Sequence, residues 1–203
     1  MDIDSPVEPP VTRPTSRQRL LDTAARLFYT RGINSTGIDV VIAEAGVAKG
    51  SMYHHFASKQ ALVIAYLQAQ KIGWQSSVEA VDQPTSSAVE RIEAMFAVLA
   101  EAVDHGTFHG CPFTNAAIER PDDPEIRELI AAYRCTVGDH ISVLLGGHSS
   151  PNLVARILVL YDGATTTAKL TRNSREVRIA SQLAQQLAGG TFTEPVGAAP
   201  PGA

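Results

Sequence analysis

The chain has 203 residues, 44% of them hydrophobic, which is enough to bury the core of one ordinary domain or two small ones. No window approaches the roughly 20 unbroken apolar residues of a membrane-spanning helix, nothing resembles a signal peptide, and two cysteines are too few for a disulfide framework. The net charge of −4 is uneven, because residues 12–60 carry seven basic and three acidic side chains whereas residues 61–203 carry ten basic and fifteen acidic ones. We therefore expect a cytoplasmic protein in which a basic, polyanion-binding segment is attached to an acidic body.

Helical periodicity dominates the sequence from residue 17 onward. Apolar residues recur at steps of three and four, and no alternating pattern of useful length predicts a strand. Thr36 stands three residues before Asp39 in a capping-box-like arrangement, and Asp123 before Pro124 marks another helix start. The predicted helices cover residues 17–31, 36–46, 49–56, 59–81, 89–103, 113–119, 124–145, 151–171 and 174–188.

This pattern predicts an all-α protein of about nine helices in two domains. Residues 16–76 would form a three-helix domain with a helix-turn-helix, and residues 77–188 a helical regulatory and dimerisation domain. Residues 1–15, with four prolines, predict a disordered arm, and the Gly-, Pro- and Ala-rich residues 189–203 predict a disordered tail.

The stretch AGVAKGSMYHHF, residues 45–56, contains a mixture of residues that could suit several kinds of site. A Walker-type phosphate loop is excluded, because Lys49 precedes its glycine and a helix, not a strand, lies upstream. Adjacent His54 and His55 point to different sides of a helix and do not make a zinc site. Two short helices joined by a tight turn at Gly46, with small and polar residues leading the second helix, instead predict a helix-turn-helix that enters the major groove of DNA.

Residues 17–67 resemble the N-terminal DNA-binding domain of the TetR family of transcriptional regulators. The resemblance rests on the helix end LFYTRG, the turn and recognition helix AEAGVAKGSMY and the closing pattern YxxFxSKxxL, which together cover about a quarter of the chain. Gly37 stands where many relatives carry a threonine, and Ala48 where a capping serine is common. The resemblance implies contacts with phosphates or base edges for Thr36, Gly37, Lys49, Gly50, Ser51, Tyr53, His54 and Lys59.

The C-terminal two-thirds resembles the family's regulatory domain more loosely. A near-palindromic operator calls for two recognition helices, so we expect a homodimer, held together by apolar stripes on the last two helices. These stripes comprise Leu153, Ile157, Leu160, Ala164, Ala168, Val177, Ala180, Leu183, Ala184 and Leu187. A small, largely apolar effector of unknown identity would bind between helices and release a repressor from its operator. The candidate effector-binding residues are Met95, Phe96, Leu99, His109, Phe113, Asn115, Tyr133, Tyr161 and Thr165, and Trp74 could couple the pocket to the DNA-binding domain.

Other functions are open at this level. No GxSxG or HExxH motif indicates an enzyme, and no cofactor or metal is expected. A regulator of the same fold could instead respond to oxidation at Cys111, which follows a glycine, or to a metal bound by His105, His109 and Cys111, although Gly106 and Gly110 disfavour the helix that would bring these ligands together. A protein that keeps the fold but binds no operator would be an interaction module.

Overall fold

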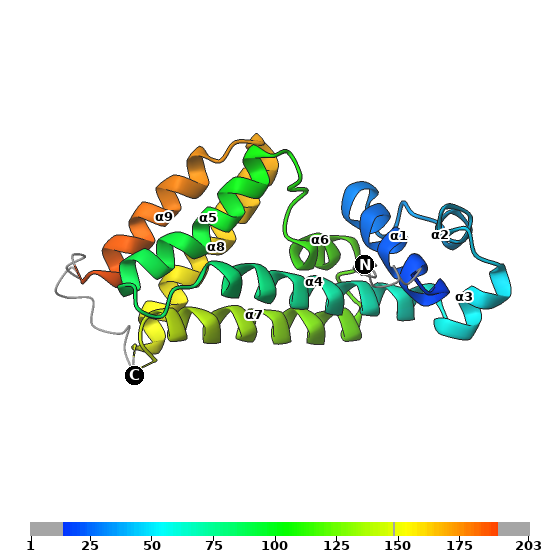
Figure 1. Cartoon of the computed structure of the whole chain (residues 1–203), viewed down its shortest axis with the longest axis horizontal. Coiled ribbons are helices and arrows are strands. Elements are labelled where there is room, and N and C mark those ends of the chain that lie inside the picture. The colour runs from blue at the N-terminus through cyan, green and yellow to red at the C-terminus, as the bar shows by residue number, and fades with distance from the viewer. Residues whose placement is uncertain (1–13, 148, 191–203) are drawn as a thin grey trace, which may run out of the picture. The chain divides into compact units, whose positions relative to one another are not determined.

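The computed structural model describes residues 14–147 and 149–190, and these residues form nine α-helices and no strand (Figure 1). The all-α prediction is thus confirmed. The helices are α1 (Ser16–Arg31), α2 (Ile38–Ala45), α3 (Lys49–His55), α4 (Lys59–Val81), α5 (Ala88–Asp104), α6 (Pro112–Glu119), α7 (Pro124–Leu144), α8 (Pro151–Thr171) and α9 (Arg175–Ala188). The predicted arm and tail lie, for residues 1–13 and 191–203, outside the described residues.

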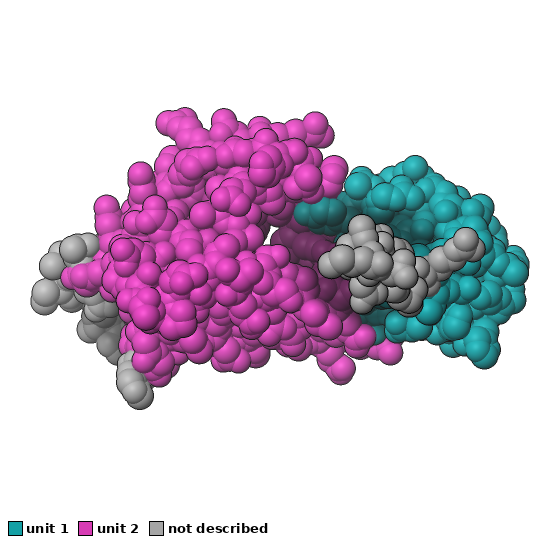
Figure 2. All heavy atoms as spheres, in the orientation of Figure 1, with its two compact units in different colours: residues 1–66 teal, residues 67–203 magenta. Residues whose placement is uncertain are grey.

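The chain divides into two compact units, one ending at Tyr66 and the other beginning at Leu67 (Figure 2). The division falls inside α4, earlier than the boundary expected after residue 76. Within the parts of the chain that are described, no helix combines the length and apolar character needed to cross a bilayer.

The N-terminal unit is built on α1, whose buried side chains Leu20, Ala24, Leu27 and Phe28 form one stripe at helical spacing. The side chain of Thr15 caps the helix by accepting a hydrogen bond from the Gln18 amide. The helix ends at Gly32, and α1 packs against both α2 and α3. The result is a small three-helix core, completed by the start of α4, on which a surface helix can be held rigidly.

In the C-terminal unit, α9 packs against α5 and α8, and α7 packs against α6 and α8 (Figure 1). A complete capping box starts α5, because Ser87 accepts from the Glu90 amide while the Glu90 carboxylate accepts from the Ser87 amide. The apolar stripe of α5 that faces the interior comprises Ile92, Met95, Phe96, Leu99, Ala100 and Val103. This packing gives the unit a helical core that surrounds a group of aromatic side chains.

Candidate nucleic-acid interface

The turn between α2 and α3 depends on Gly46. Its backbone is left-handed (φ 62°, ψ 41°), a conformation that costs a residue with a Cβ roughly 1–2 kcal/mol. The Gly46 amide donates to the Ala43 carbonyl, and the Val47 amide donates to the Ile42 carbonyl at 3.3 Å. Arg19, from α1, donates to the Gly46 carbonyl at 3.3 Å and so fixes the turn against the first helix.

Helix α3 has a buried side and an exposed side. Met52 is fully buried and anchors the helix to the core. Lys49, Gly50 and His54 are exposed, Tyr53 is 47% exposed and Ser51 is partly exposed. Ala48 occupies the N-cap position and makes no side-chain capping bond, as its identity suggests. The five predicted contact residues of this helix therefore keep surface that can approach a ligand.

Thr36 does not belong to this exposed surface. Its side chain is 2% exposed, and its hydroxyl donates to the Gly32 carbonyl at 2.7 Å. Gly37, not Thr36, is the N-cap of α2, so the predicted capping box with Asp39 does not form. The expected phosphate contact through the Thr36 hydroxyl is corrected here, because a hydroxyl that is buried and already bonded cannot reach DNA.

Replacing Thr36 by valine tests this structural role. The substitution keeps the shape but removes the donor, so the N-terminal unit should lose about 1–3 kcal/mol of unfolding free energy. Urea unfolding followed by circular dichroism measures the loss. Thr30→Val is the matched control, because the Thr30 hydroxyl bonds the Arg26 carbonyl at an exposed site on α1. DNA affinity well below the unfolding transition should not change; a large loss of affinity would restore Thr36 as a contact residue.

Lys59, at the start of α4, also has a structural role. Its ammonium donates to the Ile33 carbonyl at 2.6 Å and lies 6.0 Å from the centre of the Phe28 ring. The side chain of Ser58 caps α4 by accepting from the Ala61 amide at 3.1 Å. Contact of Lys59 and of the Gly37 amide with phosphate stays a prediction.

The other arginines that the structure describes in the N-terminal unit have partners within it. Arg26 and Arg31 share the Glu44 carboxylate, at 2.5 Å and 3.4 Å, and the hydrogen bond from Arg26 is the main reason why the pKa of Glu44 lies below its ordinary value. Arg17 lies over the Phe56 ring, 5.2 Å from its centre.

Lys49, the first residue of α3, forms an exposed ion pair with Asp39 of α2, with 3.1 Å between its ammonium nitrogen and a carboxylate oxygen. This hydrogen bond raises the pKa of Lys49 above its ordinary value. Sequence patterns do not report this pair, because Asp39 and Lys49 are ten residues apart and lie on different helices.

Aromatic side chains cluster in the C-terminal unit, around Trp74. The Trp74 ring lies edge-on to Tyr133, His140 and Tyr161, and its indole N–H donates to the Tyr161 hydroxyl at 2.9 Å. Phe96 packs edge-on against Tyr161. Seven predicted effector residues are buried in this unit: Met95, Phe96, Leu99, Phe113, Tyr133, Tyr161 and Thr165.

His140 is a member of this cluster that the sequence analysis missed, although it follows Tyr133 by seven residues, two turns along α7. Its Nε2 is buried without a hydrogen-bond partner among the described residues. Burial lowers the pKa of His140, against the opposing effect of Asp82 and Glu79. His140 Nε2 therefore adds a polar atom to a cluster that already contains the Trp74 indole N–H and the Tyr161 hydroxyl.

The predicted polar anchors His109, Asn115 and Thr165 are already bonded elsewhere. The Asn115 side chain accepts a hydrogen bond from the Lys169 ammonium and donates one to the His109 carbonyl. The residue His109 is itself exposed. The Thr165 hydroxyl donates to the Asp162 carbonyl of its own helix at 2.9 Å. The aromatic cluster itself offers other polar groups to a ligand, such as the Tyr161 hydroxyl and His140 Nε2.

Cys111 stands at the N-cap of α6 and is partly exposed, and Cys135 is exposed. Burial is the main reason why the pKa of Tyr133 lies well above its ordinary value, and the neighbouring Cys111 thiol adds to the shift. Within the described residues, His, Cys, Asp and Glu side chains nowhere gather in threes that could hold a metal ion, so His105, His109 and Cys111 do not converge.

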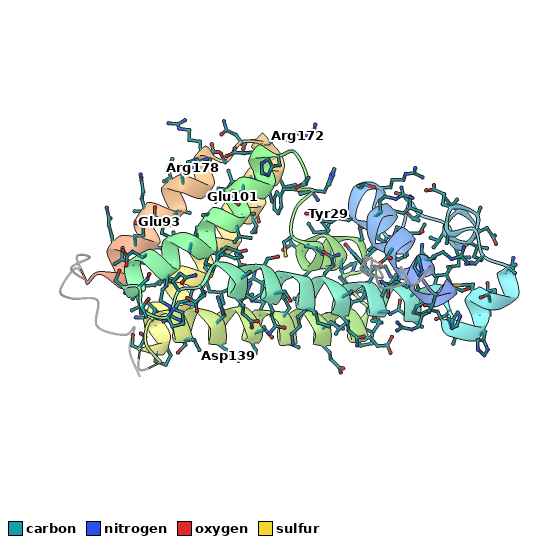
Figure 3. The ribbon with its side chains drawn as sticks, in the orientation of Figure 1. Tyr29, Glu93, Glu101, Asp139, Arg172 and Arg178 are labelled. Carbon is teal, nitrogen blue, oxygen red and sulfur yellow. The ribbon has the colours of Figure 1, made fainter. Side chains whose placement is uncertain are left out.

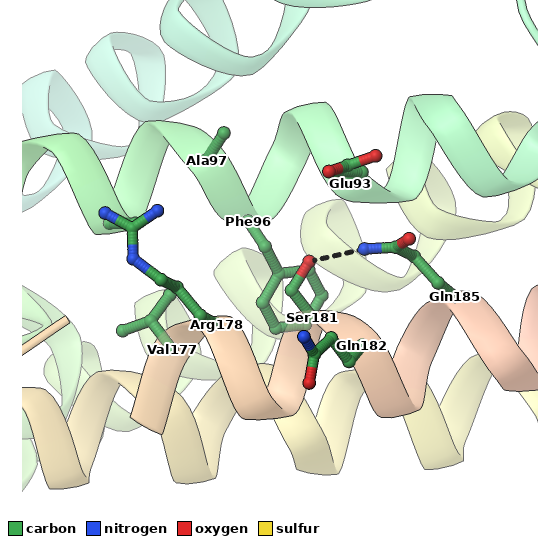
Figure 4. Close-up of a pocket in the computed structure, with 9 residues that line it drawn as sticks. Glu93, Phe96, Ala97, Val177, Arg178, Ser181, Gln182 and Gln185 are labelled. Carbon is green, nitrogen blue, oxygen red and sulfur yellow. Dashed lines mark hydrogen bonds between the residues drawn. The ribbon is translucent and has the colours of Figure 1, made fainter. Parts of the chain in front are cut away.

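A groove of about 230 Å³ runs between α5 and α9 (Figure 4). Its apolar lining consists of Phe96, Ala97, Ala100 and Val177, and its polar lining consists of Glu93, Arg178, Ser181, Gln182 and Gln185. Gln185 donates to the Ser181 hydroxyl at 3.1 Å. The same pair of helices carries charged side chains, namely Glu93 and Glu101 on α5 and Arg178 on α9 (Figure 3). Arg178 donates to the Asp104 carboxylate at 2.6 Å. Sequence periodicity gave no sign of this groove.

The dimer stripes predicted on α8 and α9 divide into two sets. Six of the residues pack inside their own unit and have almost no exposed surface: Ile157, Ala164, Ala168, Val177, Ala180 and Ala184. These six are corrected to core residues, because a side chain without exposed surface offers no contact area to a partner. Leu153, Leu160, Leu183 and Leu187 keep exposed surface.

A neighbouring apolar surface joins the exposed part of these stripes. Val159 is 65% exposed and Leu183 is 39% exposed. Together they border a recess of about 560 Å³ whose lining also includes Asn152, Ala155, Arg156, Leu160 and Leu187. We call the surface formed by these seven residues the α8–α9 face.

Known proteins resemble the whole of this arrangement. The family described as bacterial regulatory proteins, tetR family, matches residues 20–66. The repressor KstR2 of Mycobacterium tuberculosis is 33% identical over 89 residues, which are 44% of this chain and span only 44% of that protein. The repressor DhaR of Mycobacterium sp. is 27% identical over 175 residues, covering 80% of this chain and 87% of that protein.

Structural similarity extends beyond the matched N-terminal segment. The crystal structure of SCO4454, a TetR-family transcriptional regulator from Streptomyces coelicolor, superposes with a TM-score of 0.73 at 30% sequence identity. The match covers 86% of this chain and 87% of that one. The exposed recognition helix and the similarity across both units lead to one conclusion: the chain is a member of the TetR family of transcriptional regulators.

Proposed function

We propose that the protein is a homodimeric transcriptional repressor, acting in the cytoplasm, that leaves its operator when a small effector binds its C-terminal unit. One observation carries the proposal: α3 is anchored by Met52 and exposes Lys49, Gly50, Tyr53 and His54 just after a tight turn. That is the geometry of a helix whose first turn meets base edges in the major groove. KstR2 and DhaR, which are similar to this chain, are both named as repressors.

Two copies of α3 are needed for a near-palindromic operator, with a spacing of roughly 34 Å between successive major grooves. The α8–α9 face is the proposed dimer interface, because it places Val159, Leu160, Leu183 and Leu187 on one surface. Exposed apolar surface of this kind, rimmed by polar residues such as Asn152 and Arg156, is typical of protein–protein interfaces.

The aromatic cluster is the proposed site at which a largely apolar effector acts. Its residues come from α4, α5, α7 and α8, so a ligand that separated the rings would shift several helices at once. Trp74 is the member on α4, the helix that runs from Lys59 to Val81 and belongs to both units. A coupling of roughly 1–3 kcal/mol between effector and operator would change operator affinity by about 5- to 150-fold.

Tyr53→Ala tests the role of α3. Operator affinity should fall by at least about 100-fold, because a hydrogen bond to a charged phosphate, worth about 1.5–3 kcal/mol, disappears from each of the two half-sites. Fluorescence anisotropy with labelled DNA from upstream of the gene measures the affinity. Thermal stability should stay the same because the side chain is 47% exposed.

Tyr53→Phe separates the two parts of this side chain. It keeps the ring and removes the hydroxyl, and we expect it to reproduce most of the loss if phosphate is the partner. Normal binding by Tyr53→Ala would place the DNA contact elsewhere on the molecule.

A further inference from the structure

The ion pair between Asp39 and Lys49 joins the two helices of the helix-turn-helix on their exposed side. Asp39 lies in the first turn of α2 and Lys49 is the first residue of α3, and their side chains are 76% and 65% exposed. Lys49 is the only lysine or arginine within Lys49–His55. The cation of the recognition helix thus already has an anionic partner before any DNA is present.

The partners of the other cations set this pair apart. Arg19 donates to a backbone carbonyl and Arg17 lies over a ring, and neither of these contacts brings a negative charge to the cation. Glu44 compensates Arg26 and Arg31 at the α1–α2 contact. Asp39 is the carboxylate that compensates the charge of α3 itself.

Phosphates and base edges make different demands on Lys49. A lysine ammonium has three donors, so Lys49 can keep its bond to Asp39 while donating another hydrogen to a base acceptor such as guanine O6 or N7. To neutralise a phosphate fully, it must leave Asp39, whose carboxylate also repels the phosphate. Asp39 therefore weakens contacts with phosphates, which carry no sequence information, more than it weakens contacts with base edges, which do carry it.

We propose that Asp39 is a specificity-determining positioning residue, which holds the Lys49 ammonium for base edges and withholds it from phosphates in DNA of the wrong sequence. This inference rests on the proposed DNA-binding function and adds a residue that makes the binding selective. No contact between Asp39 and DNA is required.

Asp39→Asn tests the proposal on a short labelled duplex of scrambled sequence, so no operator needs to be known. We expect the variant to bind this duplex about two- to thirtyfold more tightly than the wild type, the range set by one exposed ion pair of about 0.2–1 kcal/mol in each of two subunits. The slope of log affinity against log salt should steepen by up to about 1.8, because each subunit can add one phosphate contact worth about 0.9. Asp39→Glu, which keeps the charge, should restore the wild-type slope.

Asp22→Asn is the matched control. Asp22 is an exposed carboxylate on α1 that accepts a hydrogen bond from the neutral Gln18 side-chain amide at 2.7 Å, so the variant changes net charge equally without releasing a cation. Its salt slope should equal that of the wild type. If Asp39→Asn binds scrambled DNA no better than Asp22→Asn does, the proposal is overturned, while the DNA-binding function is unaffected.

A double-mutant cycle identifies the route of the effect. In a Lys49→Gln background, Asp39→Asn should gain no more affinity than Asp22→Asn does, because the cation it releases is gone. A gain that persists without Lys49 would mean that Asp39 acts on DNA directly and would overturn the positioning role. On a fragment that the wild type binds specifically, Asp39→Asn should lower the ratio of specific to scrambled affinity. A wild type that binds neither DNA at low salt would overturn the proposed function and this inference together.

Discussion

Replacing Leu183 by glutamate is expected to convert the protein from a dimer to a monomer and to lower operator affinity by at least roughly 100-fold. Leu183 is 39% exposed on the α8–α9 face, where it borders the same recess as Val159 and Leu187. A carboxylate there would lose its hydration in the dimer but would remain in water in the monomer. Light scattering coupled to size-exclusion chromatography gives the oligomeric state, and anisotropy gives the DNA affinity.

Ile72→Glu is the control for this experiment. Ile72 is 63% exposed on α4, outside the residues of the α8–α9 face, so a glutamate there should leave both the dimer and the affinity unchanged. A Leu183→Glu protein that remains dimeric would show that the two copies associate through another surface.

Replacing Phe96 by alanine is expected to lower the unfolding free energy of the C-terminal unit by about 3–5 kcal/mol. Phe96 is 1% exposed, and its ring lies 5.4 Å from that of Tyr161, centre to centre. Truncation removes this contact, leaves a cavity in the core and takes away part of the lining of the α5–α9 groove. Phe96→Leu should lose less, because it keeps more of the buried volume.

Trp74 fluorescence is the appropriate probe for this measurement. Trp74 is the only tryptophan of the chain, and it contacts Tyr161, the same ring that Phe96 contacts. Because the two units need not unfold together, a local probe measures the transition of the C-terminal unit by itself. A loss below about 1 kcal/mol would contradict a tightly packed aromatic cluster.

The helices were predictable because their ends are encoded locally. Asp123 caps α7 with Pro124 in the first position, and Gly46 closes α2 in the left-handed conformation, as the sequence indicates. Such signals act over three or four residues and need no knowledge of the tertiary structure. The exposed side of α3 was also predictable from the local sequence, because Met52 and Phe56 are the apolar residues of this short segment and both are buried.

The positions of side chains across several elements were less predictable. On α8, Ile157 and Ala164 share their stripe with Leu160, and the sequence cannot say which of them faces the chain's own core and which a partner. Periodicity gives the relative phase of apolar residues, but the neighbouring helix decides which part of the stripe is covered. Backbone partners were unpredictable for a related reason: the Thr36 hydroxyl bonds the Gly32 carbonyl and the Lys59 ammonium bonds the Ile33 carbonyl, and sequence patterns do not report such bonds.

The most direct test is to measure binding of the purified protein to the DNA upstream of its gene, across a salt series and with excess scrambled competitor. A dimeric repressor should bind specifically with two subunits per site, and its affinity should fall steeply as salt rises. Tyr53→Ala should abolish this binding at the same protein concentration. Binding that scrambled competitor removes completely, both here and in a genome-wide search for bound sites, would contradict an operator-binding function.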